Sequence, residues 1–237
     1  MSNLAPNALL IAGTDTDAGK TVLTSALAAY WQRYCLDRLG IFKPIQTGVG
    51  DREHYQHVFG CDPDQVNPVH FQMPVAPPLA ADAEGRQIEL ETVWQAFEQM
   101  RQTHDWVLVE GLGGLGSPIN HTTTVADLAW DWRLPTLLVV PVRLGAIGQA
   151  VANVALARQS RVHLKGIILN CVQPCDDREI EYLASRELIE SLTHVPVLGL
   201  MPYLSEVTNL DRLIQLATAL DLERILPFCP SPSTPVS

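Results

Sequence analysis

Residues 13–21 are the stretch whose residue types and spacing are best suited to chemistry. They read Gly-Thr-Asp-Thr-Asp-Ala-Gly-Lys-Thr, after an apolar run at 8–12 and before a helical pattern at 22–30. A loop between a strand and a helix presents backbone N–H groups to phosphate oxygens. In such a loop Lys20 contacts the β- and γ-phosphates, and the Thr21 hydroxyl is a ligand of Mg²⁺. The stretch therefore predicts a phosphate-binding loop.

The first glycine of this loop is displaced from its usual place. The common pattern has a glycine five residues before Gly19, where this chain has Thr14, and Gly13 stands one position earlier. The alternative interpretation is a glycine-capped turn with an exposed lysine. The Gly-Lys-Thr triplet at the start of a helix favours phosphate binding over that alternative.

Three polar residues, Lys43, Glu110 and Asn170, come at the ends of other apolar runs. In a parallel sheet the carboxyl ends of the strands lie at one edge, where ligands bind. We therefore expect these side chains near the phosphate loop. Lys43 is then a second cation for anionic substrates, and Glu110 holds Mg²⁺ directly or through water.

Each candidate also has a structural alternative. Lys43 could leave the sheet edge for solvent, and Glu110 could cap the glycine-rich turn that follows it. Asp51 either completes the metal site or N-caps the helix after it, and the sequence favours neither. Asp17 either contacts metal or substrate, or is a solvated acid of the loop.

The Asn170 carboxamide can both donate to and accept from the edge of adenine. The alternative is an asparagine in a turn. A guanine-type Asn-Lys-x-Asp motif is absent, because Cys171 and Gln173 occupy the Lys and Asp positions. This difference favours ATP over GTP.

The pattern of apolar runs predicts an α/β fold. Strands are expected at 8–12, 40–45, 105–110, 135–142, 165–170 and 195–200, and helices at 22–30, 90–103, 122–132, 145–159, 177–192 and 210–222. Their alternation predicts a doubly wound, mostly parallel sheet with helices on both faces. Residues 61–88 are expected to be a long ordered excursion after a short helix. The domain is predicted to span 1–227, and the Pro/Ser-rich segment 228–237 to be a mobile tail.

The composition excludes several classes of partner. The chain has 237 residues and a net charge of −10, which disfavours nucleic acid and anionic membranes as partners. Five cysteines without a C-x-x-C pair are typical of reduced thiols in a cytoplasmic protein. The sequence shows neither a signal peptide nor a run approaching the ~18 apolar residues of a membrane span.

These motifs together resemble dethiobiotin synthetase. The resemblance rests on the loop at 13–21, Lys-Pro-Ile-Gln-Thr-Gly at 43–48, Glu-Gly-Leu-Gly-Gly at 110–114, Leu-Gly at 144–145 and Asn170, and covers residues 8–222. It implies a P-loop homodimer that converts 7,8-diaminononanoate, CO₂ and MgATP to dethiobiotin, ADP and phosphate. The steps it implies are a carbamate, a carbamic–phosphoric anhydride and closure of the ureido ring.

The resemblance also implies a role for individual residues. Lys20 and Lys43 would be the catalytic cations, and Thr21, Asp51 and Glu110 would hold Mg²⁺. The nucleotide would contact Asp17, Ala18, Gly19, Lys20, Thr21, Val22, Asn170, Pro202 and Leu204. The diamine and its carbamate would contact Thr16, Asp17, Lys43 and Thr47, and the substrate carboxylate would contact Gly145, Ala146 and Tyr182 across the dimer.

Two other functions remain possible at this point. One is a P-loop ATPase switch of the partitioning or metallochaperone type. Such proteins usually have a second lysine early in the loop, where this chain has Asp15 and no basic residue before Gly19. The other is a small-molecule kinase, which would share the loop but does not explain Lys43 and Glu110 together.

Overall fold

Six strands form the central sheet of this computed structural model, which describes residues 7–227. The strand order is β2-β5-β1-β6-β7-β8, and every pairing is parallel. The strands are β1 Ala8–Gly13, β2 Leu39–Phe42, β5 Trp106–Gly114, β6 Thr136–Pro141, β7 Leu164–Asn170 and β8 Val197–Met201. The predicted parallel α/β fold is therefore confirmed, whereas the predicted tail at 228–237 lies outside the described residues.

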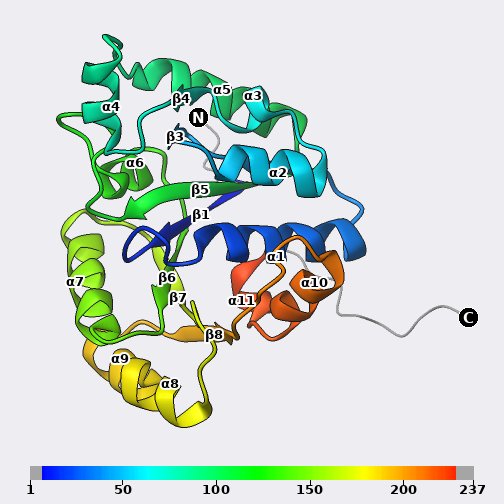
Figure 1. The fold of residues 1–237 in the computed structure, drawn as a ribbon, viewed down its shortest axis with the longest axis vertical. Coiled ribbons are helices and arrows are strands. Elements are labelled where there is room, and N and C mark those ends of the chain that lie inside the picture. Colours follow the sequence, from blue (N-terminus) through cyan, green and yellow to red (C-terminus); the bar gives the residue numbers. More distant parts are fainter. Residues whose placement is uncertain (1–6, 228–237) are drawn as a thin grey trace, which may run out of the picture.

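Helices cover both faces of this sheet (Figure 1). One face packs against α1 Lys20–Tyr34, α10 Leu210–Thr218 and α11 Leu222–Ile225. The other packs against α5 Leu90–Thr103, α6 Val125–Asp131, α7 Ala146–Gln159 and α9 Arg186–Thr193, with α8 Asp177–Ala184 beside α9. None of the described helices is long and apolar enough to cross a membrane.

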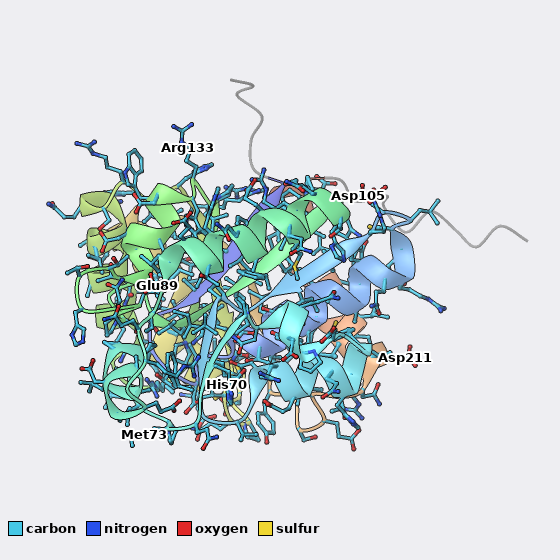
Figure 2. All side chains as sticks on the ribbon, turned by 90° about the horizontal axis from the view of Figure 1, so that it is seen from above. His70, Met73, Glu89, Asp105, Arg133 and Asp211 are labelled. Carbon is cyan, nitrogen blue, oxygen red and sulfur yellow. The ribbon has the colours of Figure 1, made fainter. Side chains whose placement is uncertain are left out.

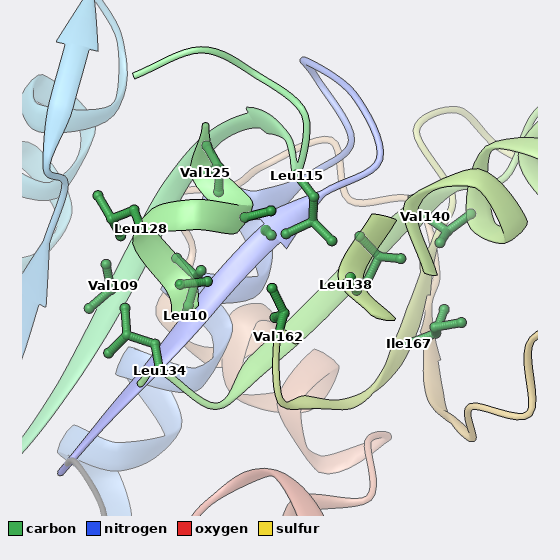
Figure 3. Close-up of a cluster of buried hydrophobic side chains, with 14 of the residues drawn as sticks. Leu10, Val109, Leu115, Val125, Leu128, Leu134, Leu138, Val140, Val162 and Ile167 are labelled. Carbon is green, nitrogen blue, oxygen red and sulfur yellow. The ribbon is translucent and has the colours of Figure 1, made fainter. Parts of the chain in front are cut away.

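Strand β1 shows why the sheet is buried on both faces. Its side chains alternate, so that Leu10 joins one core cluster while Leu9 and Ile11 join the other. Figure 3 shows the first cluster, in which Leu10 and neighbouring strand residues meet Val125 and Leu128 of α6. An apolar run without polar alternation is the sequence signal of such a strand.

The strand expected at 40–45 ends earlier, at Phe42, in keeping with the proline at position 44. After β2, Lys43 and Pro44 leave the sheet, and β3 Ile45–Thr47 pairs with β4 Val69–Phe71 in a separate parallel sheet of two strands. Proline has no N–H for the strand ladder, so the main sheet cannot continue through Pro44. This break turns Lys43 inward.

The excursion at 61–88 contains more regular structure than predicted. The expected short helix before it is α2 Asp51–Phe59, and the excursion itself holds α3 Pro63–Val66, β4 and α4 Pro77–Ala83. Pro63 and Pro77 stand at the first helical positions, where a missing N–H has no cost. Figure 2 shows His70 and Met73 of this segment on the side of the molecule away from Arg133.

Two predicted helices and one predicted strand have different ends in the structure. The helix expected at 177–192 is broken at Ser185, whose hydroxyl accepts from the Leu188 N–H and starts a second helix. The helix expected at 210–222 ends at Thr218, and the short α11 follows. Strand β5 does not end at Glu110 but runs on to Gly114, because its glycine-rich end pairs with Gly13 of β1.

Candidate functional site

The phosphate loop lies between β1 and α1, as predicted. Gly19 precedes the first residue of α1 with φ of 100° and makes no side-chain cap, so the first N–H groups of the helix are left for a ligand. A Cβ at Gly13 would lie 2.7 Å from the Asp15 carbonyl oxygen. The displaced glycine is therefore required where the loop folds back on the strand, while Thr14 fits at the usual glycine position with its backbone N–H bonded to Val139.

Lys20 begins α1 and is buried beside the loop. Its ammonium donates to the carbonyl oxygen of Asp15 at 3.1 Å. Burial lowers the pKa of Lys20, and the charge of Lys43 lowers it further. Among the described residues no carboxylate lies within ion-pair distance of Lys20, so its charge is directed to an incoming anion.

A cluster of buried Lys43 and Glu110 with half-buried Asp51 and Thr21 forms the wall next to the loop. The Lys43 ammonium lies 2.5 Å from Asp51 Oδ2 and 2.8 Å from Glu110 Oε1. The Thr21 hydroxyl lies 2.8 Å from Asp51 Oδ1 and 3.1 Å from Glu110 Oε1. Residues far apart in the sequence thus meet at one point, as the rule for parallel sheets predicts.

These contacts argue against the structural alternatives for Lys43, Asp51 and Glu110. Lys43 is only 4% exposed, so it does not leave the sheet for solvent. Gly50, not Asp51, is the N-cap residue of α2, and the Asp51 carboxylate turns into the cluster. Glu110 does not cap the glycine-rich segment, because both its carboxylate oxygens are bonded to side chains.

Electrostatics within the cluster follow from its burial. Burial opposes ionisation of Asp51, but the charge and hydrogen bond of Lys43 outweigh it and lower the pKa of Asp51 to about 2. Burial likewise opposes the charged form of Lys43, but Glu110 and Asp51 raise its pKa. For Glu110 burial dominates and raises the pKa, even though Lys43 opposes it. The single ammonium of Lys43 does not balance the charge of the two carboxylates.

The donor set of this cluster fits Mg²⁺. Asp51, Glu110 and Thr21 offer only oxygen atoms, which are the ligands that Mg²⁺ prefers. The excess carboxylate charge favours a dication. No group of three or more His, Cys, Asp or Glu side chains suited to a metal occurs among the described residues, so phosphate oxygens and water would have to complete the coordination.

A cavity of about 650 Å³ opens beside the cluster. Predicted residues that line it are Thr16, Asp17, Gly19, Lys20, Thr21, Val22, Lys43, Thr47, Asp51 and Glu110. The remaining lining residues form a wall that was not predicted, made of Ile45, Gln46, Leu112, Gly113, the segment 74–77, Ser117 and Pro118. The length and proline content of 61–88 were the sequence signal for part of that wall.

A smaller cavity of about 250 Å³ lies on the other side of the loop. Asn170 and Leu204, which were expected to hold the adenine, line it together with Asp17, Gly19 and Val22. Pro202 is not among its lining residues, whereas the neighbouring Tyr203 is, as are Cys171 and Val172. These additional residues flank predicted ones in the sequence, and no other signal marked them.

Asn170 also supports the phosphate loop. Its Nδ2 donates to the Ala18 carbonyl oxygen at 2.9 Å, and a Cβ at Gly19 would lie 1.9 Å from the same nitrogen. Ala18 itself is buried and takes part through its backbone. The residue predicted to bind the base therefore packs directly against the loop predicted to bind the phosphates.

The predicted carboxylate anchors do not lie in either cavity of the described chain. Gly145 precedes α7 with φ of 92°, and Ala146 is buried as its first residue. Tyr182 is 75% exposed on α8. Neither the three of them nor their helices contribute to the linings of the two cavities.

Comparison with solved structures agrees with the α/β fold. A chain of the MinC:MinD cell division protein complex of Aquifex aeolicus superposes with a TM-score of 0.60 at 15% identity, covering 95% of this chain and 98% of that one. A ParA family ATPase from Chlorobium tepidum TLS gives a TM-score of 0.57 at 13% identity, over 92% and 98%. At such identities the likeness shows the fold alone.

Sequence comparison is more specific. A family model described as an AAA domain matches residues 7–211. The ATP-dependent dethiobiotin synthetase of Gloeothece citriformis is 55% identical over 224 residues, which are 93% of this chain and 99% of that protein. The enzyme of that name from Gloeobacter violaceus is 44% identical over 215 residues, 91% and 94% of the two chains. With such identity over nearly the whole of both partners, the chain belongs to the dethiobiotin synthetase family.

Proposed function

We propose that this chain closes a ureido ring on 7,8-diaminononanoate with CO₂, using MgATP and releasing dethiobiotin, ADP and phosphate. Its family membership makes it an ATP-dependent ligase of biotin biosynthesis. The observation that carries the reaction steps is the meeting of Lys20 and Lys43 at one cavity, with Thr21, Asp51 and Glu110 beside them.

The first chemical requirement is charge neutralisation. One substrate amine adds to CO₂ and loses a proton, giving a carbamate anion. A carbamate oxygen then attacks the γ-phosphorus of ATP, and ADP leaves. Two anions must approach each other, so cations aligned between them lower the barrier. Lys20 is placed for the phosphates, and Lys43 for the carbamate and the γ-phosphoryl group.

The second requirement is closure of the ring. The other amine attacks the carbonyl carbon of the carbamic–phosphoric anhydride, the C–O bond to phosphate breaks, and the amine loses a proton. This step needs both nitrogens near one carbon. Thr16 and Thr47 line the large cavity with Asp17, and their hydroxyl and carboxylate groups are suited to hold the diamine.

Mg²⁺ would be held by Thr21, Asp51 and Glu110, which fit it by donor type and charge. When bound, it would supply positive charge to the β- and γ-phosphates.

The adenine would enter the smaller cavity, where Asn170 and Leu204 lie and where Pro202 follows β8. Asn170 uses one amide hydrogen for the loop and retains its oxygen and second hydrogen for the base.

We also propose a homodimer in which the substrate carboxylate reaches the partner subunit. Support comes from the position of Tyr182, which is exposed and lies outside the cavity of its own chain. Exposed Leu144, Leu188 and Leu192 lie near these anchors in the sequence, and exposed apolar side chains favour burial at an interface. The start of α7 at Gly145 and Ala146 is suited to a carboxylate.

The ATPase switch remains the second candidate, because the solved structures of similar fold include a cell division complex and a ParA family ATPase. Their identity of 13–15% carries no more than the fold. The loop of this chain has no basic residue before Gly19, and the relatives at 44–55% identity bear the name dethiobiotin synthetase. These observations favour the ligase.

The two candidate functions differ in the substrates that ATP hydrolysis requires. Phosphate release is measured with ATP and Mg²⁺ in the presence of diaminononanoate and bicarbonate together, and of each alone. We expect release only with both, in a one-to-one ratio with dethiobiotin measured by mass spectrometry. Equal ATP turnover without the diamine would overturn the ligase proposal.

A further inference from the structure

Tyr55 is a buried polar residue that the proposed reaction does not use. It lies on α2, has 0% exposure and packs against the rings of His54 and Phe59. Its hydroxyl donates a hydrogen bond to Glu110 Oε2. Phenylalanine would fill the same space with the same ring, so packing does not explain the hydroxyl.

The two carboxylate oxygens of Glu110 accept hydrogen bonds from different side chains. Oε1 accepts from Lys43 at 2.8 Å and from Thr21 at 3.1 Å, on the side of the cavity. Oε2 accepts from Tyr55 on the side of the core. Tyr55 therefore fixes the rotation of the carboxylate, with one oxygen held back and the other presented to the cavity.

The phenol O–H of Tyr55 donates this bond, and the Glu110 carboxylate accepts it. A hydrogen bond that an ionised carboxylate accepts is stronger than a hydrogen bond between two neutral groups.

Tyr55 also connects two of the proposed metal ligands. It stands four residues after Asp51 on α2, so the two side chains lie on the same face of the helix. The bond from Tyr55 to Glu110 ties this face to β5. Tyr55 thus adds a link between the positions of Asp51 and Glu110, beside the contacts that both carboxylates share with Lys43 and Thr21.

We propose that Tyr55 is a positioning residue for the divalent-metal site, which orients Glu110 and sets its distance from Asp51. The proposal rests on the metal ligands named under the proposed function. Groups that hold a metal ligand in place change metal affinity by about 10- to 100-fold when they are removed. The role is distinct from packing, which the aromatic ring provides.

The test is Tyr55→Phe, which deletes the hydroxyl and keeps the ring. Mg²⁺ is titrated calorimetrically into protein saturated with a non-hydrolysable ATP analogue, and Mn²⁺ is titrated in parallel. We expect the concentration for half-saturation to rise about tenfold. The affinity for the analogue without metal should stay within a factor of about two, because Tyr55 lines neither cavity.

Tyr30→Phe is the matched control. Tyr30 is 1% exposed and belongs to the same core cluster as Tyr55, but it lies on α1 and is not a partner of Glu110 in the described hydrogen bonds. This variant should bind Mg²⁺ like the natural protein. An equal metal affinity for Tyr55→Phe and Tyr30→Phe would overturn the proposal, whatever the melting temperature of either variant.

A double-mutant cycle with Glu110→Gln gives a second measurement. If Tyr55 acts through Glu110, adding Tyr55→Phe to Glu110→Gln should weaken Mg²⁺ binding by less than twofold, against about tenfold in the natural background. Equal effects in both backgrounds would contradict the proposal. Since metal binding is read without turnover, a protein that binds Mg²⁺ as expected but forms no dethiobiotin would contradict only the proposed function.

Discussion

The two lysines of the large cavity have different electrostatic tasks. Lys43 is balanced by Asp51 and Glu110, which lie at 2.5 and 2.8 Å. Lys20 is bonded to the backbone oxygen of Asp15. Removal of Lys43 therefore leaves buried carboxylates without their counter-charge, whereas removal of Lys20 leaves a carbonyl group without one donor.

This difference predicts that two alanine variants differ in stability. Lys43→Ala should lose about 3–5 kcal/mol of stability, since its removal leaves the buried Glu110 carboxylate without its counter-charge. That loss corresponds to roughly 2–4 °C in Tm per kcal/mol for a chain of this size. Lys20→Ala should keep Tm within a few degrees and lose turnover by at least about 10²-fold.

Thermal unfolding and phosphate release under saturating substrates check both profiles. In Lys43→Ala the rate of the chemical step, measured in a single turnover, should fall far more than adenine affinity. A normal kcat in that variant would remove Lys43 from the mechanism. Retained activity in Lys20→Ala would mean that the loop is not the phosphate site.

At the scale of elements, the start of α1 and the end of β7 pack directly against each other. Gly19 leaves room for the side chain of Asn170, and Asn170 in turn holds the Ala18 carbonyl. The helix start and the strand end thereby have a fixed separation. Both the phosphate site and the smaller cavity depend on this contact.

Gly19→Ala should therefore damage nucleotide binding. The φ of 100° costs a side chain about 1–2 kcal/mol, and the new Cβ would displace Asn170. We expect the Kd for ATP, from titration of a fluorescent analogue, to rise at least about tenfold. Unchanged affinity would show that Asn170 and the loop are not coupled.

Gly148→Ala is the control for a glycine that no contact requires. Gly148 lies inside α7, and a Cβ there meets nothing within 4 Å. Alanine should stabilise this helix by about 0.5–1 kcal/mol. Tm should rise by a few degrees while the Kd for ATP stays the same.

The sequence predicted the elements that follow local rules and missed those that depend on distant contacts. β1, β6 and β7 are continuous apolar runs, and their buried state follows from composition. The pairing of β3 with β4 joins two strands of three residues each, too short for a periodic signal. The break at Ser185 depends on a cap that competes with a continuous helix.

The same distinction applies to the site. The places of Lys43 and Asn170 were predictable because strand ends share one edge of a parallel sheet. Glu110 joins Lys43 although β5 continues past it to Gly114. The role of Tyr55 was not predictable, since a tyrosine in an amphipathic helix predicts only a buried ring. Its bond to Glu110 spans 55 residues, and no spacing rule links a helix interior to a strand at that distance.

At the scale of the whole molecule, the proposed substrate anchors and the cavity belong to different regions. The phosphate loop and the cluster of Lys43, Asp51, Glu110 and Thr21 line the large cavity, whereas Tyr182 is exposed on α8. Helix α8 lies far from α2, which carries Asp51 (Figure 1). A single chain would then hold the reacting end of the diamine without its carboxylate. A second copy would complete the site if its α8 lay across the cavity mouth.

Mixing two inactive variants tests this arrangement. Lys20→Ala lacks a working loop, and Tyr182→Ala lacks an anchor, so each should be inactive alone at low diamine concentration. After joint refolding, hybrid dimers would contain one intact site, and about one quarter of the natural activity should return by random pairing. If mixing restores nothing while size-exclusion chromatography shows dimers, the site lies within one chain.

The pairing of Gly13 with Gly114 has a last consequence, for the entropy of binding. It joins the phosphate loop to the glycine-rich end of β5, and a Cβ at Gly114 would lie 2.8 Å from the Thr14 carbonyl oxygen. Two segments that would otherwise be free are thus immobilised when the chain folds. Ordering them is a cost of folding and not of association, so the affinity for nucleotide is not diminished by it. The pairing that orders the loop is thus already formed before its ligand arrives.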